Sequence, residues 1–306
     1  MTGVQTCALP IWYGLTGSIQ TTTQKALFGY GYTPSYVSLT NLVSNTGVVA
    51  TDTTGVGTSR NLLAAAGYGG DKAIFGYGYT GSNVSLTNLV SNTGVVATDT
   101  TGVGTARNGL AAAGYGGDKA IFGYGYTGSN VSLTNLVSNT GVVASDTKGV
   151  GTARSGLAAA GYGGDKAIFG YGYISSASSL TNLVSNTGVV ASDTTGVGTA
   201  RNYPTATGYG TDKAIFGYGY TSSNSSLTNL VSNTGVVASD TTGVGTARNA
   251  LAAAGYGGDK AIFGYGQTAS NSSLTNLVSN TGVVATDTTG VGTARQYLAA
   301  AGYSTT

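Results

Sequence analysis

The sequence predicts an all-β fold built from six copies of one short unit, and three observations carry this prediction. Glycine interrupts every apolar run and glutamate is absent, a composition that disfavours helices. The apolar runs are of strand length and are bounded by turn residues. The motif Phe-Gly-Tyr-Gly recurs every 47 residues, beginning at Phe28, Phe75, Phe122, Phe169, Phe216 and Phe263.

One repeat contains four predicted strands. In one copy they are LAAAGY, KAIFGYG, SLTNLVS and GVVASDT, at residues 110–115, 119–125, 132–138 and 141–147. Glycines in 116–118 and 139–141 supply the positive φ angles that tight hairpins need, so we expect antiparallel pairing. The stretch 114–119 (GYGGDK) also resembles a phosphate-binding loop, but such a loop leads into a helix and this one leads into a strand.

Four antiparallel strands per repeat make the blade of a β-propeller, and a period in the forties is typical of that architecture. The strands do not alternate cleanly between apolar and polar residues, which fits strands covered on both faces by neighbouring blades. We expect the alanines at 111–113 in the innermost strand, and Phe122 and Tyr124 farther out between the blades. The sequence therefore predicts a six-bladed β-propeller of four-stranded antiparallel blades.

The positions within the repeat at which the array begins and ends favour a closed ring. Residues 25–306 span 282 residues, or six times 47, and begin at the second strand of a unit. Residues 25–57 would supply three strands of one blade and residues 298–303 the fourth, so the N- and C-terminal segments would pair and close the ring. A fragment of a longer array is the alternative. Residues 1–11 resemble a translated sequencing adapter, and we expect 1–24 to be this artefact plus an unstructured lead-in before the propeller at 25–306.

Charge and composition argue against several functions. The 13 basic and 11 acidic side chains give a net charge of +2 with no basic patch, so we expect no nucleic-acid partner. No run reads as a transmembrane helix, and we expect no membrane insertion. The chain lacks histidine, and its one cysteine, Cys7, lies in the adapter-like stretch, so catalytic triads and zinc sites cannot be assembled. We expect no enzyme activity, no cofactor and no metal; calcium at the repeated aspartates is a minor alternative, because their spacing lacks a calcium-loop pattern.

The repeat resembles the kelch repeat. Arg107 is followed by NGLAAAGYGGDKAIFGYG and then by SLTNLVSNTGVVASDT up to Arg154: an arginine, a first strand, a turn, an aromatic strand ending in glycines, and two outer strands. The kelch double glycine appears here as Gly-Tyr-Gly, and the kelch tryptophan has no counterpart. The resemblance implies a propeller used mainly for recognition. The array also resembles kelch-like repeats of environmental viral sequences, for which tail or adhesion roles have been suggested.

The repeated arginines are expected to be structural. They should reach from each blade connection into the neighbouring blade, bond to carbonyls or aspartate there and hold the blades in register. They lie 47 residues apart at Arg60, Arg107, Arg154, Arg201, Arg248 and Arg295.

The copies differ in two places, the loop between the second and third strands and the segment just after each arginine. Both should emerge on one side of the disc. Tyr, Ser, Asn and Gly dominate there, as they do in adaptable binding surfaces. The alternative is that these loops drift without function. The candidate partner-binding residues are Tyr32, Tyr36, Tyr79, Asn83, Tyr126, Asn130, Tyr173, Tyr203, Tyr220, Asn224, Gln267, Asn271 and Tyr297.

These observations favour a non-enzymatic recognition module, lectin-like or adhesin-like, that binds glycan or protein on a cell or particle surface through the variable loop face. A rigid structural spacer in a viral tail or another assembly is the alternative function. The sequence does not identify the compartment, although an extracellular or virion-associated place suits either role.

Overall fold

The computed structural model describes residues 23–305, which form six three-stranded antiparallel sheets and no helix. We call the sheets blades 1 to 6 in the order of their middle strands. The middle strands are β1 (Thr23–Tyr32), β4 (Lys72–Gly76), β7 (Lys119–Gly123), β10 (Lys166–Gly170), β13 (Lys213–Tyr220) and β16 (Lys260–Gly264). The all-β fold and its sixfold repetition are therefore confirmed.

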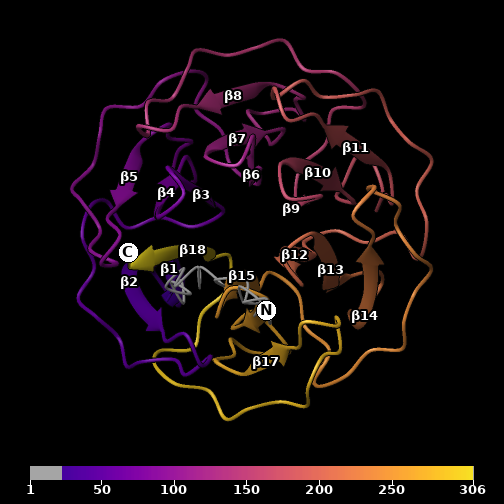
Figure 1. Cartoon of the computed structure of the whole chain (residues 1–306). Coiled ribbons are helices and arrows are strands. Elements are labelled where there is room, and N and C mark those ends of the chain that lie inside the picture. Colours follow the sequence, from indigo (N-terminus) through magenta and orange to yellow (C-terminus); the bar gives the residue numbers. More distant parts are fainter. Residues whose placement is uncertain (1–22, 306) are drawn as a thin grey trace, which may run out of the picture.

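The six sheets lie around a common axis (Figure 1). The inner strands, nearest this axis, are β18 (Ala299–Thr305), β3 (Ala64–Tyr68), β6 (Ala111–Tyr115), β9 (Ala158–Tyr162), β12 (Thr205–Tyr209) and β15 (Ala252–Tyr256). The outer strands are β2 (Tyr36–Val43), β5 (Thr87–Val90), β8 (Thr134–Val137), β11 (Thr181–Val184), β14 (Asn224–Val231) and β17 (Thr275–Val278).

The predicted fourth strand is wrong, because residues 141–147 form only two isolated bridges with β8. Val143 bridges Val137 and Thr147 bridges Thr134, so the outer segment has one residue more than the strand it faces. An extra residue on one side breaks a ladder. The side chain of Asn135 compensates, since its Nδ2 donates to the Ala144 carbonyl at 2.9 Å. The same offset recurs in the other five blades, which are three-stranded.

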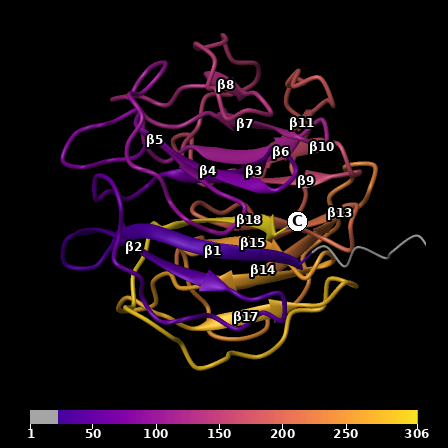
Figure 2. The same cartoon turned by 60° about the vertical axis from the view of Figure 1, so that its left-hand side comes forward.

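Blade 1 combines the two ends of the described chain. Strand β18 pairs with β1 in antiparallel register from Thr23 opposite Thr305 to Gly29 opposite Ala299, and Figures 1 and 2 show the two strands side by side. Strand β1 begins at Thr23, two residues before the expected propeller boundary at Lys25, because Thr23 and Gln24 take part in this pairing. The adapter-like stretch and Cys7 lie outside the described residues.

The core consists of clusters between adjacent blades. One of them joins Tyr115, Ile121 and Tyr124 of blade 3 to Phe169 and Val184 of blade 4. Each sheet is thus buried on both faces, which explains why the middle strand shows four consecutive buried residues instead of an alternating pattern.

The packing between blades is close enough to require glycine at one position of each repeat. A Cβ atom added to Gly123 would lie 2.6 Å from Cζ of Phe169 in the next blade. The same close contact recurs around the axis, so the phenylalanine of each Phe-Gly-Tyr-Gly motif requires the first glycine of the motif in the neighbouring blade.

Candidate recognition surface

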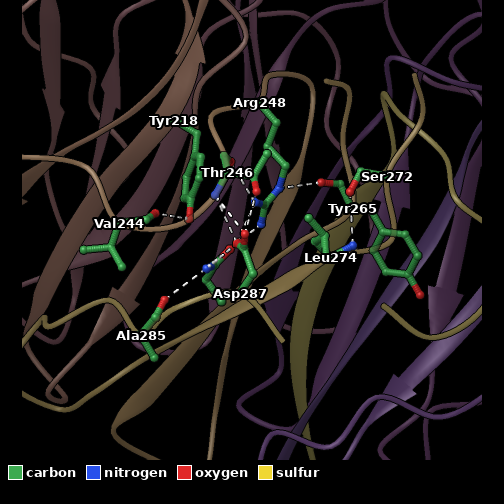
Figure 3. Close-up of polar contacts among 10 residues, drawn as sticks. Tyr218, Val244, Thr246, Arg248, Tyr265, Ser272, Leu274, Ala285 and Asp287 are labelled. Carbon is green, nitrogen blue, oxygen red and sulfur yellow. Dashed lines mark hydrogen bonds and ion pairs between the residues drawn. The ribbon is translucent and has the colours of Figure 1, made fainter. Parts of the chain in front are cut away.

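Each arginine in a blade connection is fully buried and contacts both adjacent blades. Arg107 donates from Nε to the Tyr124 carbonyl (2.8 Å) and from Nη2 to Asn135 Oδ1 (2.6 Å), both in blade 3. Its guanidinium also lies over the ring of Tyr77 in blade 2, 4.2 Å from the ring centroid. Figure 3 shows the same arrangement for Arg248, between the ring of Tyr218 and the carbonyl of Tyr265. The guanidinium therefore links two blades through hydrogen bonds and a ring contact.

The aspartate of each outer segment completes this unit. Asp146 accepts hydrogen bonds from the N–H and Oγ1 of Thr105 (2.9 and 2.6 Å) and from Asn135 Nδ2 (2.9 Å), and lies 3.7 Å from Arg107. Partial burial raises the pKa of Asp146, but these hydrogen bonds and the positive charge outweigh it and hold the pKa below its usual value. Its oxygens are thus engaged in holding the blade connection.

The expected place of Tyr124 between blades is correct, but its bond to Arg107 and that of Asn135 were not predicted. These residues lie 17 and 28 positions after the arginine, whereas Tyr30 and Asn41 take the same roles for Arg295. Tyr124 has φ near +64°, is fully buried, and donates its hydroxyl to the Val150 carbonyl at 3.1 Å. Burial raises the pKa of Tyr124 to about 12, although Arg154 acts in the opposite direction. The signal that could have found them is a polar residue at constant spacing within an apolar strand.

The two variable segments lie side by side on one face, which we call the loop face. The N–H of Asn108 donates to the Tyr126 carbonyl (3.1 Å), and the N–H of Tyr126 donates to the Asn108 carbonyl (2.8 Å). The side chains of Tyr126, Tyr173 and Tyr220 are 42%, 41% and 39% exposed. The counterparts in the other three blades, Tyr32, Tyr79 and Gln267, are only partly exposed.

The candidate asparagines serve the scaffold. Asn83 Nδ2 donates to the Tyr126 carbonyl of the next blade (3.1 Å), and Asn83 Oδ1 accepts from Asn108 Nδ2 (2.6 Å). We call this bond to the next blade the amide clasp. The same bond joins Asn130 to the Tyr173 carbonyl, Asn224 to Gln267 and Asn271 to Tyr32.

Two seams between blades lack the amide clasp. In blade 1 the equivalent residue is Tyr36, whose ring packs against Tyr32 (5.6 Å between centroids) and across the seam against Tyr79 (6.1 Å). In blade 4 the equivalent residue is Ala177, which cannot donate. Beneath these two seams, Oδ1 of Asn61 and of Asn202 is buried without a hydrogen-bond partner among the described residues.

The candidates Tyr203 and Tyr297 lie elsewhere on the loop face, at the axis, where their rings meet edge to face with centroids 5.2 Å apart. They belong to a set of six equivalent residues with φ between +48° and +60°. Each N–H in the set donates to the carbonyl of its counterpart in the preceding blade, at 2.7–3.2 Å, so that the bonds form a continuous cycle. We call it the axial cycle; its members are Leu62, Gly109, Gly156, Tyr203, Ala250 and Tyr297.

The axial cycle explains much of the variation after each arginine. Six residues converge on the axis, so their side chains cannot all be large, and two of the six are glycines. A Cβ atom added to Gly156 would lie 3.0 Å from Cε1 of Tyr203, so this glycine makes room for the tyrosine ring. The hollow left among the six residues and their neighbours is only about 70 Å³.

Comparisons with models of known protein families and with curated proteins found no match to this chain. Within residues 23–305, no group of three or more His, Cys, Asp or Glu side chains is placed so that it could hold a metal ion. The same part of the chain contains no helix long and apolar enough to cross a membrane.

Proposed function

We propose that the chain is a closed six-bladed β-propeller of kelch-like type, and that it acts as a non-enzymatic recognition module. It binds glycan or protein on a cell or particle surface through the loop face. The β1–β18 pairing and the axial cycle support closure, and the arginine that links neighbouring blades supports the kelch-like character of the repeat.

The observation that carries the proposed function is the set of exposed tyrosines on a fixed backbone. Tyr126, Tyr173 and Tyr220 come from consecutive blades, and each is about two fifths exposed. Backbone hydrogen bonds to the neighbouring variable segment hold the main chain of all three, so a partner does not have to order the backbone that carries the rings. Tyrosine offers a flat apolar face and a hydroxyl together, which suits both sugar rings and protein surfaces.

The scaffold role of the asparagines narrows the binding surface. Asn83, Asn130, Asn224 and Asn271 already donate to the next blade, so the contacts to a partner fall mainly to tyrosine rings. The cluster of Tyr32, Tyr36 and Tyr79 extends the aromatic surface across the seam between blades 1 and 2.

The test is a glycan-array screen of the full chain beside a variant in which Tyr126, Tyr173 and Tyr220 are replaced by alanine. A control variant replaces Val95, Val142 and Val189 by alanine, because these side chains are about two thirds exposed and lie away from the loop face. We expect selective glycan binding that the tyrosine variant loses and the valine variant keeps.

Circular dichroism must show that all three proteins are folded. Equal binding by both variants would overturn the assignment of the loop face. If folded wild-type protein binds no glycan, glycan recognition is wrong, and a protein partner or the spacer role in an assembly replaces it.

A further inference from the structure

A cavity on the axis, lined by all six inner strands, has no part in the proposed function. It has a volume of about 470 Å³, within the range of small-molecule sites. Its wall is made by the six inner strands, which place alanine and glycine there, as at Ala159 and Gly161. At the loop face the axial cycle surrounds the axis, whereas the opposite end is lined by the hairpin turns between the inner and middle strands.

Five lysines, one from each of blades 2 to 6, line the cavity at the hairpin-turn end. They are Lys72, Lys119, Lys166, Lys213 and Lys260. The side chains are 43–47% exposed. In blade 1, where no hairpin turn joins β18 to β1, Gln24 and Ser304 line the wall at this level.

The acidic partners of these lysines lie mostly outside the cavity. Asp118 is 3.4 Å from Lys119 Nζ, yet its other oxygen accepts from Asn139 Nδ2 at 3.0 Å, which holds the carboxylate toward the outer turn. Asp165, Asp212 and Asp259 are held by an asparagine in the same way, and of the five hairpin aspartates only Asp259 lines the cavity. The lining therefore includes five lysines and one aspartate, and each lysine lies 2.7–3.6 Å from the aspartate that precedes it in the chain.

The wall adds further donors. Each inner strand pairs with only one other strand, so its second edge faces the axis. A strand edge presents backbone N–H and C=O groups, and N–H groups bind anions when they converge. Small side chains keep this edge accessible, and an ammonium that pairs with one carboxylate oxygen retains N–H groups for a second acceptor.

We propose that the axial cavity binds a compact multivalent oxyanion, a polyphosphate or a polycarboxylate, held by several lysines at once. A single-charge anion would reach too few of the ammonium groups to bind comparably. The site is independent of the loop face, because the residues of the axial cycle and the exposed tyrosines take no part in it.

Isothermal titration calorimetry of the full chain at low salt tests the proposal, with sodium tripolyphosphate and citrate as probes and acetate for comparison. We expect binding of at least one multivalent probe and none of acetate. Replacing Lys119, Lys166 and Lys213 by glutamine should weaken the affinity by about 100-fold or more, since each charged hydrogen bond contributes close to a factor of ten. Lys148→Gln is the matched control, because Lys148 is exposed and does not line the cavity.

A second variant tests the location without changing charge. Ala159 lines the cavity and also packs against the core between blades 3 and 4, so circular dichroism must first show that Ala159→Leu is folded. The folded variant should bind the same probe more weakly, while the variant of the three loop-face tyrosines should bind it as the wild type does. The proposal is overturned if neither multivalent probe binds, if the triple lysine variant binds as tightly as the wild type, if Lys148→Gln weakens binding as much as the triple variant, or if Ala159→Leu has no effect.

Discussion

A guanidinium buried without compensation would destabilise any fold, and here each one is matched by partners from two directions. On folding, the guanidinium of Arg107 loses its contacts with water and gains contacts with a carbonyl, an amide oxygen, a nearby carboxylate and an aromatic ring. These partners are themselves buried or half-buried, so removing the arginine would leave several polar groups without a donor.

Arg107→Ala should therefore lower the free energy of unfolding by about 3–5 kcal/mol, as the loss of one partner from a buried ionic unit does. The stability of Arg107→Lys should lie between those of Arg107→Ala and the wild type, because an ammonium keeps the charge but cannot reproduce the planar set of donors. Lys148→Ala, an exposed charge in the same repeat, should stay within ~0.5 kcal/mol of the wild type. Urea denaturation measures all three, and equal stability of Arg107→Ala and Lys148→Ala would contradict the linking role.

At the scale of elements, the seam between blades 4 and 5 has the most buried polar atoms without a hydrogen-bond partner among the described residues. Ala177 provides no amide clasp, and Asn202 Oδ1 and Arg201 Nε are buried without a hydrogen-bond partner within residues 23–305. Nε of the other five arginines donates to a tyrosine carbonyl. The seam between blades 2 and 3, which has Asn83, provides the comparison.

Ala177→Asn should increase the free energy of unfolding by about 1 kcal/mol, the usual net contribution of a hydrogen bond. The new amide would lie opposite the Tyr220 carbonyl and beside Asn202, as Asn83 lies opposite Tyr126 and beside Asn108. Asn83→Ala should lower stability by a similar amount. Thermal unfolding of both variants decides the matter, and a destabilising Ala177→Asn would show that the two seams are not equivalent.

How far the sequence predicted these elements depends on where each interaction lies. Three strands of every repeat follow from local signals, because glycine turns and strand-length apolar runs act within one copy. The prediction of a fourth strand was wrong because Thr134 and Val137, three positions apart, pair with Thr147 and Val143, which are four positions apart. Strand propensity does not reveal such an offset. The asparagines and Tyr203 were read as free surface because their partners belong to other blades, and a repeat period does not say which side chains converge on an axis.

For the whole molecule, the central question is whether the ends of the chain complete one ring. In blades 2 to 6 a three-residue turn joins the inner strand to the middle strand, whereas in blade 1 Tyr303 and Lys25 are paired without such a turn. A circular permutant can supply it, with Gly-Gly-Asp linking Tyr303 to Lys25 and new ends opened between Gly116 and Gly117.

We expect this permutant to fold as a monomer with the near-ultraviolet circular dichroism of the wild type. A linear chain that ends at Leu298, and so lacks β18, should lose cooperative unfolding because blade 1 is left with two strands. Sedimentation and calorimetry distinguish the outcomes. An unfolded or oligomeric permutant would favour a segment of a longer array over a closed ring.

Acid should destabilise the whole molecule at once. Burial raises the pKa of Asp52 and its five equivalents, but hydrogen bonds from threonine and asparagine and the arginine charge lower it further, so the net shift is downward. A lowered pKa in the folded state contributes stability that is fully present above the unfolded-state pKa of about 3.9 and is lost as the pH falls through the folded-state values.

The melting temperature should therefore change little on acidification until about pH 4 and then fall steeply, because six equivalent carboxylates act together. Asp146→Asn should be less stable at neutral pH and should show a smaller decrease in acid. Calorimetry across this range provides the measurement, and a main loss of stability between about pH 5 and pH 7 would contradict the assignment.

The pairing of β1 with β18 also has a kinetic consequence. Lys25 meets Tyr303 across nearly the whole described chain, so this contact has a very high sequence separation and should form late during folding. Until β18 pairs, β1 exposes an unpaired edge. Strand β3 of the adjacent repeat has the same Ala-Ala-Ala-Gly-Tyr sequence as β18 and can pair with that edge instead. Near-identical strands therefore compete for one partner, and exchange of β18 between two chains is the misassembled state that this architecture invites at high protein concentration.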